Sequence, residues 1–334
     1  MFVYFLILIV AFVYYVLAHE TNKSNSPLLL GVFFLYCALF IGLGDMIGGY
    51  DRYIYGEMFD SIADATDSGR DYSRLLFLVN GREYGYFLWE ILVSQVTANR
   101  YIFILLSSLL MYFLYYKAFR KYINDYPLAA IVFLGLFFYF SITYMRQALA
   151  VGIVWQGIKY IYERKAIKFF LIVALAYSFH NSALVFAVAY FIPIKKYSKK
   201  TILCFLILCI LVGLSPIPTM LIASAGDTQG MAERTGKYQD EMSGFRVEYI
   251  LEAVFFIWLF FKNYNFFDSK HKKQLVFLNL SIAFCGILLL FIRFGQGGRF
   301  GWYFFFSLIY TLTALASQSR LFTLNKPVIL LLSI

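Results

Sequence analysis

The chain has 334 residues, of which 61% are hydrophobic, and its formal net charge is +10 at pH 7. Apolar runs of about twenty residues recur along it, and each is long enough to cross a hydrocarbon core of roughly 30 Å. The sequence therefore predicts an all-α polytopic membrane protein, folded as a single domain over residues 1–334. The four cysteines lie inside these runs without CxxC spacing, which disfavours a disulfide framework or thiolate metal site, and no nucleic-acid motif is present.

The apolar runs predict about 9 to 11 transmembrane helices together with a re-entrant hairpin. The first run follows an N-terminus without Lys or Arg, which favours a retained helix over a cleaved signal sequence. The last residues, 327–334, resemble the beginning of a further span that stops early. We expect the spans at about residues 2–18, 28–44, 101–117, 127–141, 145–161, 201–222, 247–261, 274–292 and 301–318.

The turns between the spans alternate in charge, and the positive-inside rule places the Lys-rich turns in the cytoplasm. With this topology, 18 of the 29 Lys and Arg residues lie inside, and 15 of the 19 Asp and Glu residues lie outside. Ten of the 11 basic residues outside are arginines, whereas 15 of the 18 inside are lysines. Because a guanidinium binds phosphate bidentately, this sorting indicates a phosphate-binding outer face. The alternative is that translocated loops avoid lysine for reasons of insertion.

The longest stretch outside the spans, residues 45–100, is predicted to form an outer cap loop. Carboxylates alternate there with aromatic rings, a mixture that suits stacking on sugar faces and hydrogen bonding to hydroxyls. Tyr53, Glu83 and Tyr86 are its candidate glycan contacts. Aromatic belts at the membrane interface are the alternative explanation for the rings. A second outer loop, 223–246, is rich in glycine and charge, so we expect it to be mobile.

Residues 168–194 break the alternation of charge, because basic clusters flank both ends of a short apolar segment. A single crossing would expose one of these clusters on the outer side. We therefore predict a partly re-entrant hairpin of two short helices, with His180 at its tip near the outer face. A histidine that merely packs at the tip is the alternative.

Ionisable residues at the outer ends of spans are further candidates, since a charge at this depth is costly unless it is paired or lines a cavity. Arg146 begins one span and is followed by Gln147, while Arg293 and Arg299 flank a flexible glycine-rich connection that leads to Tyr303. Snorkelling of an arginine to lipid headgroups is the alternative for each.

Several ordered segments resemble landmarks of the EpsG family, the Wzy-type polysaccharide polymerases. The more specific ones are the Arg-Gln-Ala helix start at residues 146–148 and His-Asn-Ser-Ala-Leu at 180–184. The others lie at residues 50–59, 83–86 and 299–304, so that the similarity covers nearly all of the chain. The resemblance implies a GT-C-like, metal-independent glycosyltransferase that joins polyprenyl-pyrophosphate-linked oligosaccharide units into capsular, exopolysaccharide or O-antigen chains.

That chemistry gives roles to the candidates, with no cofactor and no metal. The leaving pyrophosphate needs fixed cations, which we assign to Arg146, Arg293 and Arg299, with Arg52 as a weaker candidate. Removal of the acceptor hydroxyl's proton needs a base, either His180 or Asp51. Glu83 would accept hydrogen bonds from sugar hydroxyls or pair with an arginine. The remaining glycan contacts are assigned to Tyr53, Tyr86, Gln147 and Tyr303.

The expected partners are the lipid-linked oligosaccharide donor and acceptor, membrane lipid, a flippase and a chain-length regulator, with no nucleic acid. The expected location is the bacterial cytoplasmic membrane, with the active site on the outer or periplasmic side.

Two other classes of membrane protein are alternatives to a polymerase. A lipid-oligosaccharide transporter or flippase would keep polar groups at mid-depth, accessible from both sides. A membrane acyltransferase would use His180 as its base and would have a cytoplasmic cofactor entry or a second acidic partner at a fixed spacing from the histidine, neither of which Asn181 and Ser182 supply.

Overall fold

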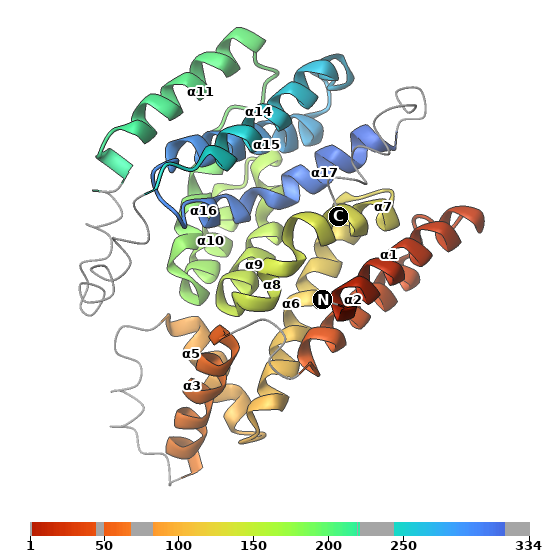
Figure 1. Cartoon of the computed structure of the whole chain (residues 1–334), viewed down its shortest axis with the longest axis vertical. Helices are drawn as coiled ribbons and strands as arrows, with labels where there is room; N and C mark the ends of the chain where they lie inside the picture. Colours follow the sequence, from red (N-terminus) through yellow and green to blue (C-terminus); the bar gives the residue numbers. More distant parts are fainter. Residues whose placement is uncertain (1, 45–49, 68–82, 219, 221–243, 318–334) are drawn as a thin grey trace. The chain divides into compact units, whose positions relative to one another are not determined.

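The structure is a computed structural model that describes residues 2–44, 50–67, 83–218, 220 and 244–317. Every regular element within these ranges is a helix (Figure 1). The chain is therefore an all-α protein with several long apolar helices, consistent with a polytopic membrane protein. Most of the predicted loop 223–246 and the C-terminal segment 327–334 lie outside the described residues.

Three helical stretches among the described residues are long and apolar enough to cross a membrane: Arg100–Tyr122, Tyr126–Thr143 and Lys272–Leu290. Shorter apolar helices occupy other predicted spans, so the total of 9 to 11 stays a prediction. Within the expected span 201–222, α11 (Lys199–Leu214) ends before Ser215 and Pro216. Proline disfavours helical backbone at the residue before it, which accounts for this end.

The chain divides into two compact units. The first contains Met1–Tyr160, Lys165–Ala187 and Leu312–Ile334, and the second contains Ile161–Arg164 and Val188–Thr311. The elements that begin in the first unit are α1 (Phe2–Glu20), α2 (Pro27–Gly42), α3 (Tyr50–Asp67), α5 (Tyr84–Ser94), α6 (Arg100–Tyr122), α7 (Tyr126–Phe133), the π-helix η1 (Leu134–Phe138), α8 (Tyr139–Thr143), α9 (Met145–Tyr162), α10 (Ala166–Phe179) and the 3₁₀-helix η2 (Asn181–Phe191).

Polar caps start several of these helices where the sequence changes from loop to apolar run. Ser26, Asn99 and Asp125 each accept a hydrogen bond from a backbone N–H in the first turn of α2, α6 and α7, respectively. Such caps satisfy N–H groups that have no partner within the helix. They fix where each apolar helix begins, and hence which of its residues face the core.

Helix α9 packs against α6 through aromatic rings and two hydrogen bonds between the helices. The Trp155 side chain is fully buried and its ring centroid lies 4.9 Å from that of Tyr115. The Tyr115 hydroxyl donates to the Ala148 carbonyl (2.9 Å), and the Gln156 amide donates to the Leu114 carbonyl (2.8 Å). Buried polar groups with partners on another helix fix its register. The first turn of α9, which carries Arg146, is thus held on a rigid support.

Helices α3 and α5 occupy the region predicted as an outer cap loop, and they lie side by side (Figure 1). The Phe59 ring stacks on that of Phe103 in α6, with centroids 4.3 Å apart. Asp60 forms an ion pair with Arg100 at the start of α6. The cap is therefore built of helices fixed to α6 at the positions that the structure describes.

The predicted hairpin segment folds as α10 followed by η2, with a break at His180, whose backbone is extended. The rings of Phe169 and Phe186 lie 5.9 Å apart, so the chain returns along α10 after the break. On which side of a membrane the break lies stays a prediction.

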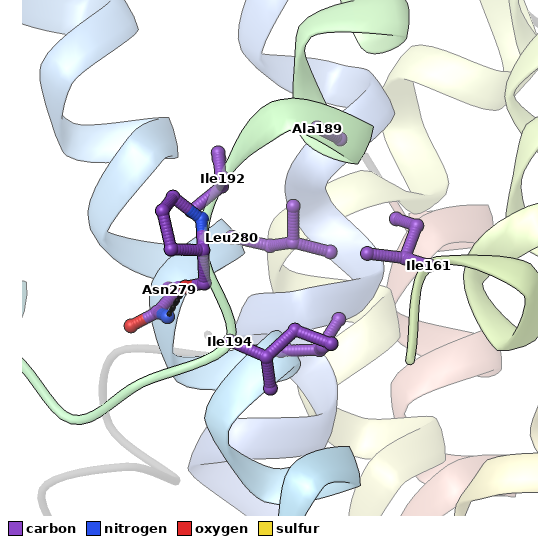
Figure 2. Close-up of a pocket in the computed structure, with 8 residues that line it drawn as sticks. Ile161, Ala189, Ile192, Ile194, Asn279 and Leu280 are labelled. Carbon is purple, nitrogen blue, oxygen red and sulfur yellow. Dashed lines mark hydrogen bonds between the residues drawn. The ribbon is translucent and has the colours of Figure 1, made fainter. Parts of the chain in front are cut away.

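The second unit contains α11, α14 (Val247–Lys262), η3 (Tyr264–Phe266), α15 (Lys272–Leu290), α16 (Gly298–Gly301), η4 (Trp302–Phe304) and most of α17 (Phe305–Ala316). A small apolar pocket in this unit is lined by Ile161, Ala189, Leu280 and neighbouring residues (Figure 2). At its edge, the Asn279 amide donates to the carbonyls of Pro193 and Lys195, both at 3.1 Å. Asn279 thereby attaches the segment after η2 to α15.

Candidate active site

Glu83 occupies the N-cap position of α5, but its side chain does not cap that helix. Its carboxylate instead reaches two other segments. Oε2 accepts from Nη1 of Arg146 at 2.7 Å, and Oε1 accepts from the backbone N–H of Asn181 at 3.2 Å. One carboxylate thus joins the starts of α5 and α9 to the break between α10 and η2, and all three segments belong to the first unit.

Arg146 follows a break in the chain at Tyr144, after which α9 begins. Its guanidinium lies over the rings of Tyr55 and Tyr86, at 5.5 and 6.0 Å from the ring centroids. Both rings are buried, and the face of an aromatic ring attracts a cation. The side chain of Arg146 nevertheless remains 31% exposed. The guanidinium is therefore held in place while part of it is accessible to an anion.

Gly85 sets the distance between α5 and the end of α10. A Cβ at this position would lie 3.0 Å from the backbone carbonyl carbon of Ser178 and closer still to that residue's side chain. Only glycine permits this approach without displacing the backbone that leads into His180. The glycine of the predicted Glu-Tyr-Gly-Tyr segment therefore has a geometric role beside the site.

His180 lies next to Glu83, with Nδ1 3.6 Å from Oε1, slightly beyond hydrogen-bond length. The backbone N–H of Ser182 donates to the same Nδ1 at 3.3 Å, and the Ser182 hydroxyl lies 3.0 Å from it. The His180 side chain is 27% exposed. An arginine, a carboxylate and an imidazole thus form one cluster, the Glu83 cluster, which we define as Glu83, Arg146 and His180.

Burial raises the pKa of the Glu83 carboxyl above its usual value, because the charged form is poorly solvated. The Arg146 guanidinium and the Asn181 N–H oppose this effect without cancelling it. A carboxyl whose pKa is displaced by burial and by one specific charge is a common feature of functional sites.

The other predicted site residues of the first unit are placed differently. Asp51 lies half-buried in the first turn of α3, and Tyr53 is 44% exposed. Arg52 is 1% exposed and donates to the Ile41 carbonyl at 2.7 Å. Tyr86 and Gln147 are each 2% exposed. Contact of these three buried side chains with a ligand stays a prediction, and it would require a movement that exposes them.

Arg293, Arg299 and Tyr303 belong to the second unit. Arg293 is exposed and donates to the Leu214 carbonyl at 3.1 Å, while the Arg299 guanidinium lies 5.8 Å from the ring centroid of Trp302. Tyr303 is fully buried, so a glycan contact there also stays a prediction.

The glycine-rich connection before Arg299 is contacted at both ends by Tyr249. The Tyr249 hydroxyl donates to the Gly295 carbonyl at 3.1 Å and accepts from the Gly298 N–H at 2.9 Å. Both ends of the connection are thus attached to one side chain of α14.

Sequence reasoning missed three features of this region. Tyr55 supports the Arg146 guanidinium, and its helical spacing from the flagged Asp51 could have placed it near the site. Ser182 contacts the imidazole from two residues further along the chain. Glu90 is completely buried on α5, seven residues after Glu83, a spacing that puts both carboxylates on one helix face.

In the described part of the chain, no group of three or more His, Cys, Asp and Glu side chains is arranged to hold a metal ion. Several apolar helices with many exposed Leu, Ile and Phe side chains are those of a multi-pass membrane protein, and the Glu83 cluster is a partly exposed polar site on it. The family model described as the EpsG family matches residues 28–334, and the chain therefore belongs to the EpsG family. No curated protein and no solved structure matches it.

Proposed function

We propose that this protein is a glycosyltransferase that polymerises polyprenyl-pyrophosphate-linked oligosaccharide units at the outer face of the cytoplasmic membrane. Its membership of a family linked to exopolysaccharide biosynthesis supports the substrate class. The observation that carries the proposal is the Glu83 cluster, in which a partly exposed guanidinium and an imidazole both lie next to one largely buried carboxylate.

In the proposed reaction, the pyrophosphate of the lipid-linked donor lies against the exposed part of Arg146. Negative charge develops on the leaving pyrophosphate as its bond to the sugar breaks, and a fixed cation stabilises that charge most in the transition state. The rings of Tyr55 and Tyr86 restrict the guanidinium, so it is already oriented before the substrate binds. Arg293 and Arg299 remain candidate ligands for pyrophosphate in the second unit.

The acceptor hydroxyl must lose its proton as it attacks. His180 is our preferred base, because it lies in the same cluster as the arginine, and a general base acts from within hydrogen-bond reach of the proton. Asp51, at the start of α3, remains the alternative. The arginines take the role that a divalent cation has in many phosphate enzymes. A GT-C-like arrangement of the helices is part of this proposal.

The test is to incubate the purified protein with a defined lipid-pyrophosphate oligosaccharide and to separate the products by size. A ladder of elongated, lipid-linked glycans supports the polymerase. Movement of intact substrate across a vesicle membrane without elongation would identify a transporter instead.

The side of the membrane is tested separately with single cysteines in a cysteine-free background. Cysteines near Lys165 and Lys199 should be shielded from an impermeant thiol reagent added outside, and one near Asp67 should react. Reaction of the Lys165 and Lys199 positions from opposite sides would contradict the hairpin topology and the outer placement of His180.

A further inference from the structure

Nδ1 of His180 is placed to accept a hydrogen bond from the backbone of Ser182. The Ser182 backbone N–H, which can only donate, lies 3.3 Å from Nδ1. A neutral imidazole that keeps this contact carries its proton on Nε2. In that tautomer Nε2–H can donate to an oxygen, but it cannot accept a proton from an attacking hydroxyl. His180 in the described state is therefore not yet a general base at Nε2.

The opposite tautomer needs an acceptor for a proton on Nδ1, and Glu83 is placed to supply one. Its Oε1 lies 3.6 Å from Nδ1, so a small movement would bring the two atoms within hydrogen-bond distance. In the described state both carboxylate oxygens are engaged elsewhere, Oε2 by Arg146 and Oε1 by the Asn181 N–H. The contact with Arg146, at 2.7 Å, is the shorter and charge-assisted one.

A phosphate group would compete with Glu83 for this guanidinium. We propose that binding of the donor pyrophosphate at Arg146 releases Glu83 to accept a hydrogen bond from Nδ1 of His180, which switches the imidazole to the tautomer with an unprotonated Nε2. The inference rests on the proposed function and adds a regulatory step to it. Glu83 is then a positioning residue that makes the base available only when the lipid-linked donor is bound.

The tautomer change moves one proton from Nε2 to Nδ1 and leaves the charge of the ring unchanged. In the transfer that follows, the acceptor hydroxyl oxygen forms a bond to C1 of the donor sugar, and the bond from C1 to the pyrophosphate oxygen breaks. The electron pair of that bond stays on the pyrophosphate, next to Arg146. The hydroxyl proton passes to Nε2 of His180.

The chain has three histidines, which makes the tautomer measurable directly. The full-length protein is labelled with ¹⁵N-histidine, placed in lipid nanodiscs at neutral pH and compared with a His180→Gln sample to assign the His180 signals. Farnesyl pyrophosphate, which carries no sugar, is the probe, and its ³¹P signals report binding. We expect His180 to be protonated on Nε2 without the probe and on Nδ1 with it.

Two variants separate the steps of the switch. Arg146→Ala should show the Nδ1–H form without the probe, since Glu83 has then lost its contact with the guanidinium. Glu83→Gln should keep the Nε2–H form with and without the probe. Binding of the probe to the parent protein without any change of tautomer would overturn the switch and leave the proposed function standing. Absence of probe binding would overturn both.

Discussion

The Arg146 guanidinium donates to the Glu83 carboxylate across 2.7 Å, although 63 residues separate the two in the chain. The pair joins the first turn of α9 to the start of α5, and the same carboxylate binds the backbone immediately after His180. It is therefore the contact through which three distant segments become one site. Because the Arg146 side chain is still 31% exposed, the pair is also where an incoming anion would act.

The first prediction concerns the geometry of the guanidinium. If Arg146 binds pyrophosphate through oriented donors, Arg146→Lys should lose on the order of 10²-fold in polymer formation, almost as much as Arg146→Ala. A lysine keeps the charge but cannot bind bidentately. The measurement is initial rate with purified protein and defined substrate.

The matched control is Arg120→Lys, since Arg120 is exposed, lies over the Tyr116 ring and has no part in the proposed site. It should polymerise at nearly the parental rate. Normal rates for Arg146→Lys would mean that Arg146 provides only bulk charge.

The second prediction separates the two candidate bases. General-base catalysis typically contributes 10²- to 10⁴-fold, so His180→Ala should lose most polymerisation while it still binds the lipid-linked substrate. Asp51→Asn should retain most activity, because Asp51 lies outside the Glu83 cluster. Rates and substrate binding are measured for both variants. The reverse pattern would assign the base to Asp51 and leave His180 a structural role at the break.

The third prediction tests the close approach at Gly85. In Gly85→Ala the new methyl group meets Ser178, so the backbone before His180 must move. A displacement on the order of 1 Å at a catalytic group can cost about 10²-fold in rate. Gly31→Ala is the control, because a Cβ there makes only ordinary contact, at 3.6 Å, with Tyr116. Equal activity of the two alanine variants, at equal protein amount, would contradict the role given to Gly85.

The fourth prediction concerns pH. Since the pKa of Glu83 is raised on folding, the folded chain binds its proton more tightly than the unfolded chain does. The contribution of Glu83 to the free energy of unfolding is therefore complete below the usual glutamate pKa and falls as pH rises through the raised value. The Tm of the parent minus that of Glu83→Gln should accordingly decrease from pH 4 to pH 7. A difference that increases over this range would mean that the pairing with Arg146 outweighs burial.

Much of the helical framework could be predicted from the sequence, because apolar runs of fixed length and polar caps such as Asn99 and Asp125 are local signals. The break at His180 could also be predicted from the sequence, since basic clusters at both ends of a short segment disfavour a single crossing. The helices of the cap were not predicted as such. Their apolar faces pack on α6 through contacts such as Phe59 with Phe103, which no local pattern specifies.

The candidate site was only partly predictable for the same reason. Sequence analysis selected Glu83, Arg146 and His180 by chemical type, but it could not pair Glu83 with Arg146 across 63 residues or show which rings support the guanidinium. For Arg52, the weaker pyrophosphate candidate, it could not show that the side chain is buried and donates to the Ile41 carbonyl. Burial depends on packing between helices, and composition alone does not determine it.

The most direct test of the central claim is a double-mutant cycle on Arg146 and Glu83, read out as the ladder of glycans formed from a defined lipid-pyrophosphate oligosaccharide in the presence of a chelator. Residues that act as one unit are strongly non-additive when both are changed. We predict a full ladder from the parent protein, losses of about 10²-fold or more from Arg146→Ala and from Glu83→Gln, and a double variant no worse than the poorer single one. Losses that multiply in the double variant would contradict the joint role of the pair, and a parent protein that forms no ladder, or forms one only with added divalent metal, would contradict the proposed mechanism.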